Sequence, residues 1–205
     1  MIEKKGSKSV KVRTFSNLPK RVTVLLAVSF SGTYLPPHIV FHGIPGGRID
    51  KELKDYKSHC IHNVQENAWT HQNIMNIWIE KVLKPYYSQI RTTKSEMGLI
   101  MLDNFSVHCT EKTSTALAEL GVKMIMLPPN TTSTTQPLDV GYNKPFKNGI
   151  RDLYNLHLVE HGLEDGSLAK ISRELLSEWI LKVWKDCEGR ISVANTLKRI
   201  EYIKE

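Results

Sequence analysis

The sequence predicts an α/β fold in which a mixed β-sheet is flanked by helices and followed by a helical C-terminal tail. Short apolar runs over residues 22–30, 97–102 and 122–127 alternate with segments of helical periodicity. Chains with this alternation generally form a sheet covered by helices. In such sheets, ligands gather at the carboxyl ends of parallel strands, so polar residues that follow the apolar runs are candidate site residues.

Length and composition are those of an ordinary globular domain. The chain has 205 residues, of which 40% are hydrophobic and 24% are charged, enough for one domain with a sizeable core. It contains no apolar run of the ~20 residues that a membrane helix needs, and no N-terminal apolar stretch of a secretory signal. The three cysteines are widely spread, which argues against a disulfide framework. These features predict an intracellular, soluble protein without a membrane partner.

The net charge of +7 weakly favours a polyanionic partner. The charge is concentrated near the start, where residues 1–21 hold seven Lys or Arg and one acid, Glu3. Three interpretations of this basic N-terminal arm stay open: a solvated segment, a phosphate-contacting segment, or part of a nuclear import signal.

The first half of the chain predicts a hairpin followed by a helix. Residues 22–30 are expected to form a buried strand, and residues 33–42 are expected to return beside it after the turn at Ser31-Gly32. Two prolines at 36–37 place the start of the returning strand at an edge. Thr70 is expected to cap a helix that runs to about Leu83 and ends at Pro85.

The second half begins with the run 97–102, which is short and continuously apolar, and we expect a strand covered on both faces. A helix is expected from about Thr110, with Gly121 just past its end. Residues 122–127 predict another strand, stopped by the prolines at 128–129, and the remainder is expected to be mostly helical. Pro145 should kink a helix that begins near Asp139, or should start a new one.

Two acids stand out as candidate site residues. Asp103 directly follows the apolar run 97–102, and Asp139 lies 36 positions later in the segment "QPLD". Hard divalent cations prefer carboxylate oxygens, so such a pair is suited to Mg²⁺ or Mn²⁺. From the residues alone, each acid is more typical of a helix or loop cap than of a metal site.

The segments "MLDNFSVH" and "LPPNTTSTTQPLDVGYNKPFK" resemble the DDE-superfamily transposases of the pogo, Tigger and jerky-like group. The resemblance extends to "KRVTVLLAVSFSG" and covers most of the chain from about residue 10. It implies a ribonuclease H-like fold, DNA as partner, a nuclear location, and phosphodiester cleavage and strand transfer assisted by Mg²⁺ or Mn²⁺. It assigns Asp103 and Asp139 as catalytic, metal-binding acids, with Asn104 and His108 beside them. Homo-oligomerisation stays open.

On this resemblance the chain divides into a basic arm (1–21), an N-terminally incomplete DDE endonuclease domain (22–160), and a helical tail (161–205) that packs on the domain or follows it. The family uses three acids, and the first belongs to a strand upstream of "KRVTVLLAVSFSG" that has no counterpart here. Two functions therefore remain: a metal-dependent nuclease or transposase core, complete or residual, and a domesticated, non-catalytic module that binds DNA or a protein.

The missing first strand has a structural consequence. In the ribonuclease H-like fold it lies in mid-sheet, between the strands 22–30 and 97–102. We expect residues 8–14 to pair there, or the two neighbouring strands to close up or leave a gap. Buried N–H and C=O groups left unpaired would cost ~1–3 kcal/mol each.

Other residues yield weaker hypotheses. The "HCIH" segment at 59–62, with His71, offers zinc-ligand types at a spacing typical of no zinc finger. Tyr86 and Tyr87 are suited to stacking on bases, but we favour packing at the helix end. We expect the two tryptophans at 179 and 184 to lie in the core.

Overall fold

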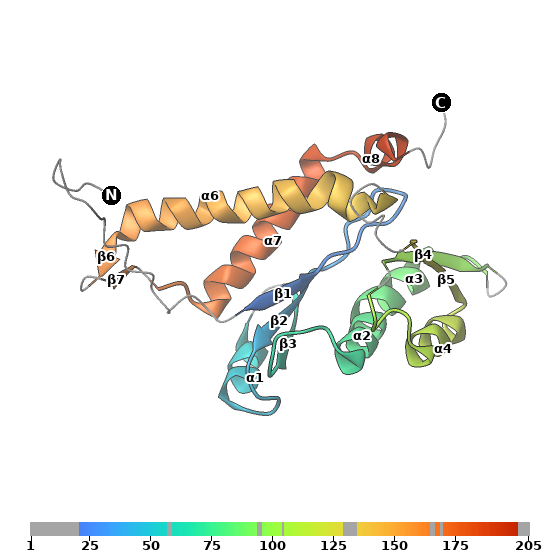
Figure 1. The fold of residues 1–205 in the computed structure, drawn as a ribbon, viewed down its shortest axis with the longest axis horizontal. Coiled ribbons are helices and arrows are strands. Elements are labelled where there is room, and N and C mark those ends of the chain that lie inside the picture. The colour runs from blue at the N-terminus through green and yellow to red at the C-terminus, as the bar shows by residue number, and fades with distance from the viewer. Residues whose placement is uncertain are drawn as a thin grey trace.

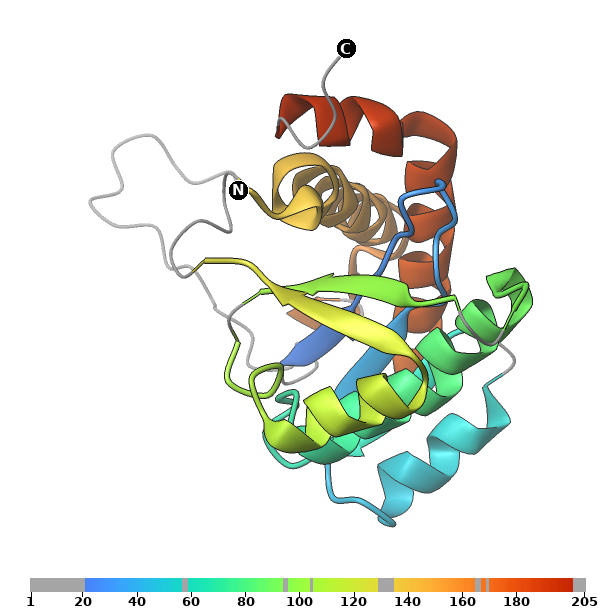
Figure 2. The same cartoon turned by 90° about the vertical axis from the view of Figure 1, so that its right-hand side faces the viewer.

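The computed structural model describes residues 21–56, 59–93, 96–103, 105–128, 135–164, 167–168 and 170–200. Within these ranges the chain is a mixed α/β structure with two small sheets among groups of helices and a third, two-stranded sheet apart from them (Figures 1 and 2). None of the described helices is long and apolar enough to cross a membrane. Residues 1–20 of the predicted arm (1–21) and Asn104 lie outside the described residues.

The first sheet has the order β1-β2-β3. Strand β1 (Val22–Leu25) pairs antiparallel with β2 (His38–His42), which confirms the predicted hairpin, although both strands are shorter than expected. The hairpin continues past β1 through the bridge between Val28 and Tyr34. Strand β3 (Ile61–Gln65) pairs parallel with β2. It was not predicted, because its sequence IHNVQ lacks a continuous apolar run.

The hairpin strand is half-buried and packs against apolar residues on both faces, which explains its continuous apolar sequence. Val22, Val24 and Val28 pack against one core cluster, formed mainly by β2 and the C-terminal helices. Leu25 and Ala27 point the other way and pack against a second cluster, formed by the central helices. Successive side chains of a strand point to opposite faces, so the strand links the two cores.

The second sheet consists of two parallel strands, β4 (Gly98–Leu102) and β5 (Val122–Met126). Both strands and the helix between them were predicted. The expectation that both faces of β4 are covered was wrong: Ile100 and Leu102 pack against the second cluster, whereas Leu99 is 62% exposed.

In the view of Figure 1, the helices α2, α3 and α4 lie close to β4 and β5, and the helices α6, α7 and α8 form the upper part of the molecule. Their bounds are α1 (Arg48–Glu52) and its 3₁₀ extension η1 (Leu53–Asp55), α2 (Gln72–Trp78), the π-helical turn η2 (Ile79–Leu83), α3 (Lys84–Ile90), α4 (Glu111–Glu119), the π-helical turn η3 (Leu138–Tyr142), α6 (Asn143–His161), α7 (Arg173–Arg190) and α8 (Val193–Arg199). Two short strands, β6 (Leu163–Glu164) and β7 (Ser167–Leu168), form a separate hairpin.

Pro85 does not end the helix as predicted. The π-helical turn η2 precedes it, and α3 then begins with Pro85 in its first turn. The change from the π-helical pattern of η2 to the α-helical pattern of α3 accommodates the missing N–H of Pro85 inside a continuous helical run. The predicted cap is also displaced, because α2 begins after His71. Around Pro145, a new helix does start, but at Asn143, after η3.

Other local predictions are confirmed. The Thr110 side chain caps α4 by accepting a hydrogen bond from the N–H of Thr113, and Gly121 follows the helix with φ +77°. Tyr87 is buried, with its hydroxyl donating to the carbonyl of Glu96 at 3.0 Å. Trp179 and Trp184 are both buried.

Candidate functional site

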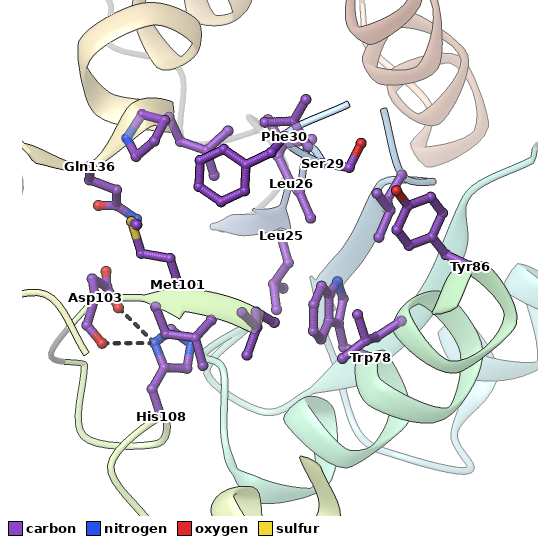
Figure 3. A pocket seen from close by; sticks show the side chains of 18 of the residues that line it. Leu25, Leu26, Ser29, Phe30, Trp78, Tyr86, Met101, Asp103, His108 and Gln136 are labelled. Carbon is purple, nitrogen blue, oxygen red and sulfur yellow. Dashed lines mark hydrogen bonds and ion pairs between the residues drawn. The ribbon is translucent and has the colours of Figure 1, made fainter. Parts of the chain in front are cut away.

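A cavity of about 700 Å³ lies between the two sheets. Its walls include β1 and the hairpin residues after it, the whole of β4, and side chains of α2 and α3. Figure 3 shows its two ends: Trp78 and Tyr86 lie at one, and Asp103, His108 and Gln136 at the other. Within the described residues, β1 and β4 do not pair, and this cavity separates them. The expected gap between these strands is therefore present; residues 8–14, the alternative filler, lie outside the described residues.

Asp103 stands at the carboxyl end of β4, as the sequence predicted. The strand is held to β5 up to this point, where the N–H of Leu127 donates to the carbonyl of Leu102 at 2.9 Å. The Asp103 side chain is 32% exposed and accepts a 3.3 Å hydrogen bond from the N–H of Phe105. A carboxylate fixed in this way, with one oxygen that bonds no described residue, can receive a cation.

His108 is the second member of this site. Its Nδ1 lies 2.7 Å from Oδ1 of Asp103, and its side chain is only 17% exposed (Figure 3). This hydrogen bond is the main cause that lowers the pKa of Asp103 below its ordinary value of 3.8, against the opposing effect of partial burial. Repulsion from a second acid would raise the pKa, so the lowered pKa of Asp103 has the opposite sign to repulsion.

A network of side chains holds the loop that carries His108. The Thr113 hydroxyl donates to the carbonyl of Val107 at 2.9 Å, and Thr113 is fully buried. Gln72, from α2, bonds both Thr113 at 3.0 Å and Thr110 at 2.6 Å. The start of α4 is thus tied to α2, which fixes the residues just before it. Nothing in the sequence spacing identified Gln72 or Thr113 as supports of the site.

Asp139 lies in the π-helical turn η3 and lines the same cavity as Asp103. Its side chain is exposed, and Oδ1 accepts a 2.5 Å hydrogen bond from Nδ2 of Asn143. Its own N–H donates to the carbonyl of Gln136 at 3.0 Å. Both predicted acids therefore border one cavity from different elements.

Two amides at this end of the cavity were not predicted. Gln136 belongs to the "QPLD" segment that marked Asp139, and Asn143 follows Asp139 by one helical turn. An i, i+4 spacing between an acid and an amide is the signal that could have identified Asn143.

Of the four residues that suggested a zinc site, two are hydrogen-bonded or buried and two are exposed. His62 bonds the hydroxyl of Ser177 at 3.1 Å, and Cys60 is buried nearby. His59 and His71 are exposed. In the portion of the chain that the structure describes, no group of three or more His, Cys, Asp or Glu residues could hold a metal ion.

Comparison with known proteins gives a consistent result. The chain is 26% identical over 188 residues to mouse and human proteins named "Pogo transposable element with KRAB domain", and the match covers 89% of this chain. The match spans 29% of the length of each relative. No solved structure matches the chain significantly. The family model for the DDE superfamily endonuclease matches residues 19–192, most of the chain. The protein therefore belongs to the DDE superfamily endonuclease family.

Proposed function

We propose that this chain is a transposase-derived endonuclease domain that binds DNA and carries the remains of a divalent-metal site for phosphodiester cleavage and strand transfer. The observation that carries the proposal is that Asp103 and Asp139, which come from different elements, line one cavity at the end of β4. The family membership supports nucleic acid as the substrate class.

The donors present fit Mg²⁺ or Mn²⁺. Mg²⁺ keeps several waters and needs only one or two protein carboxylates, which is what Asp103 and Asp139 offer. These residues would hold the metal ion, which would supply charge stabilisation for the attacking and leaving oxygens of the phosphate. In the chain itself, His108 orients Asp103 and keeps it ionised, and Asn143 orients Asp139.

For the fold, we propose a ribonuclease H-like arrangement in which the cavity between β1 and β4 marks the place of the first strand. The cavity lies along the edges of both strands that pair with no other described strand, which supports this assignment. We also propose the division into a basic arm (1–21), the endonuclease domain (22–160) and a helical tail (161–205). Helix α7 packs in one cluster with β2 through Ile180 and Val183. A nuclear location follows if DNA is the partner.

A second candidate is a domesticated, non-catalytic module that binds DNA or a protein. Within the described ranges the site offers two acids and no third acid grouped with them, and this favours the second candidate. Loss of one metal ligand would leave the fold and the surface charge in place while weakening or abolishing cleavage.

Nicking of supercoiled plasmid in Mg²⁺ or Mn²⁺ separates the two candidates. If the domain cleaves, the wild-type chain will convert plasmid to the open circle, and Asp103→Ala will not. Asp152→Ala, which removes an exposed acid on α6, is the matched control and should nick like the wild type. A wild-type chain that binds plasmid without nicking it supports the non-catalytic module. Equal nicking by Asp103→Ala contradicts the assigned site.

A further inference from the structure

The first half of α6 carries a row of exposed cations, Lys144, Lys147 and Arg151, which we name the α6 basic stripe. At 3.6 residues per turn, these three side chains lie within an arc of about 60° around the helix axis. Phe146 and Leu153 lie on the opposite side of the helix and pack into the core. The stripe therefore faces away from the body of the protein and takes no part in packing.

No described acid pairs with the stripe. The Arg151 guanidinium donates a 2.9 Å hydrogen bond to Oδ1 of Asn148, which lies between Lys147 and Arg151 in the sequence. Asp152 is the only acid between positions 140 and 159. By contrast, α7 carries four Lys or Arg and four Asp or Glu, the mixed pattern of a solvated helix. The stripe is therefore a local excess of positive charge.

The stripe begins next to the candidate site. Asp139 lies in the helical turn directly before α6. Helix α8 packs against the same turn, because a Cβ at Gly141 would lie 2.7 Å from Oγ1 of Thr196. This helix adds Lys198 and Arg199 and contains no acid. The first half of α6 and the helix that packs on the turn before it therefore both carry more cations than acids.

We infer that the α6 basic stripe lies along the phosphate backbone of a DNA duplex and leads it toward the cavity end bordered by Asp103 and Asp139. This inference rests on the proposed function and names the surface through which the partner is held. At a rise of 1.5 Å per residue, Lys144 and Arg151 are about 10.5 Å apart along the helix. One strand of B-DNA advances about 3.4 Å per phosphate, so this length spans about three phosphates. Contacts of this kind hold the duplex without reading its sequence.

Charge neutralisation on the stripe tests the inference. We compare Lys144→Gln/Lys147→Gln/Arg151→Gln with Lys51→Gln/Lys54→Gln/Lys112→Gln, which removes the same charge from exposed positions on α1, η1 and α4. These elements lie along the edge of the molecule opposite α6 (Figures 1 and 2). Binding of a labelled duplex of random sequence is followed by fluorescence anisotropy between about 50 and 200 mM salt, the range over which such contacts weaken.

We expect the stripe variant to bind at least about tenfold more weakly at about 100 mM salt, since three contacts are lost. The slope of log K against log salt should become shallower by about 2.7, at about 0.9 for each phosphate contact. The control variant should keep the wild-type slope. Lys144→Arg/Lys147→Arg should also keep it, because the charges remain.

Thermal melting shows whether the stripe variant is folded. The single Lys147→Gln variant, which removes one contact of three, should show about one third of the slope change. If wild type binds DNA but the stripe and control variants are equally affected, the inference is wrong while the proposed function stands. If wild type does not bind DNA even at about 50 mM salt, both fail. Tighter binding to a double-stranded RNA of equal length would also overturn DNA as the partner.

Discussion

The imidazole Nδ1 of His108 and the carboxylate Oδ1 of Asp103 lie 2.7 Å apart at the carboxyl end of β4. The contact joins the last residue of the strand region to a loop that α2 and α4 hold in place. The contact is also the main cause of the lowered pKa of Asp103.

Replacing His108 by Ala should raise the pKa of Asp103 toward its ordinary value of 3.8. In the wild type, a depressed folded-state pKa stabilises the protein above pH 3.8, and this contribution is lost as the pH falls through the folded-state pKa. Carbon-detected NMR titration of the Asp103 carboxyl group measures the change. His71→Ala, at an exposed position, is the control and should leave the titration unmoved. An unchanged pKa in His108→Ala would show that another group governs it.

His38 should make the stability of the protein depend on pH between about 4 and 6.5. It is fully buried on β2, burial lowers its pKa to about 4, and its Nε2 bonds Oδ1 of Asn63 at 2.7 Å. In this window the unfolded chain binds a proton that the folded chain does not, so stability falls as the pH falls. The full difference corresponds to about 3 kcal/mol.

Urea unfolding at pH 4 to 7 measures this effect. His38→Gln keeps a polar side chain but cannot take up the proton, so most of the pH dependence in this window should disappear. If wild type and His38→Gln lose stability equally between pH 7 and 4, the effect arises from other groups.

Two helical glycines should respond in opposite ways to substitution by Ala. At Gly189 in α7 an added Cβ meets no atom within 4 Å, so Gly189→Ala should raise the unfolding free energy by up to about 1 kcal/mol. At Gly149 in α6 the Cβ would lie 2.6 Å from Cγ1 of Val183, so Gly149→Ala should lower it by about 1–3 kcal/mol.

Chemical denaturation of both variants measures the difference. Val183→Ala in the Gly149→Ala background should recover part of the loss, because it removes the clashing atom. Stabilisation by Gly149→Ala would mean that α6 and α7 can move apart without cost.

Trp184 should contribute to stability through a hydrogen bond as well as through packing. Its Nε1 donates to the carbonyl of Leu35 at 2.9 Å, a buried contact between α7 and the hairpin of β1 and β2. Trp184→Phe leaves that carbonyl unsatisfied, which should cost about 1–3 kcal/mol in unfolding free energy. Trp69→Phe, at a residue that is 47% exposed, should change it by less than about 0.5 kcal/mol. Equal effects of the two substitutions would contradict the prediction.

Short stretches of sequence determined those parts of this protein that depend on interactions within a few residues. The apolar runs at 22–25, 98–102 and 122–126 are strands, the Thr110 hydroxyl caps α4, and Gly121 adopts the positive φ that ends it. Each depends on burial pattern or backbone preference within a few residues. The position of Asp103 at a strand end followed from the same reasoning, and the family followed from long motifs.

Tertiary structure decided what depends on residues far apart in the chain. Strand β3 forms because β2 pairs with it and Ser177 of α7 bonds His62, although its own sequence lacks a strand pattern. The helix passes Pro85 because a π-helical turn resets the hydrogen-bond register, and Ile79 and Val82 within that turn are buried. The same holds for the site: whether His108 reaches Asp103, and whether Asp139 borders the same cavity, depends on how separate elements pack. Burial and hydrogen bonding between distant segments outweigh the small local preferences there, and sequence spacing alone does not contain that information.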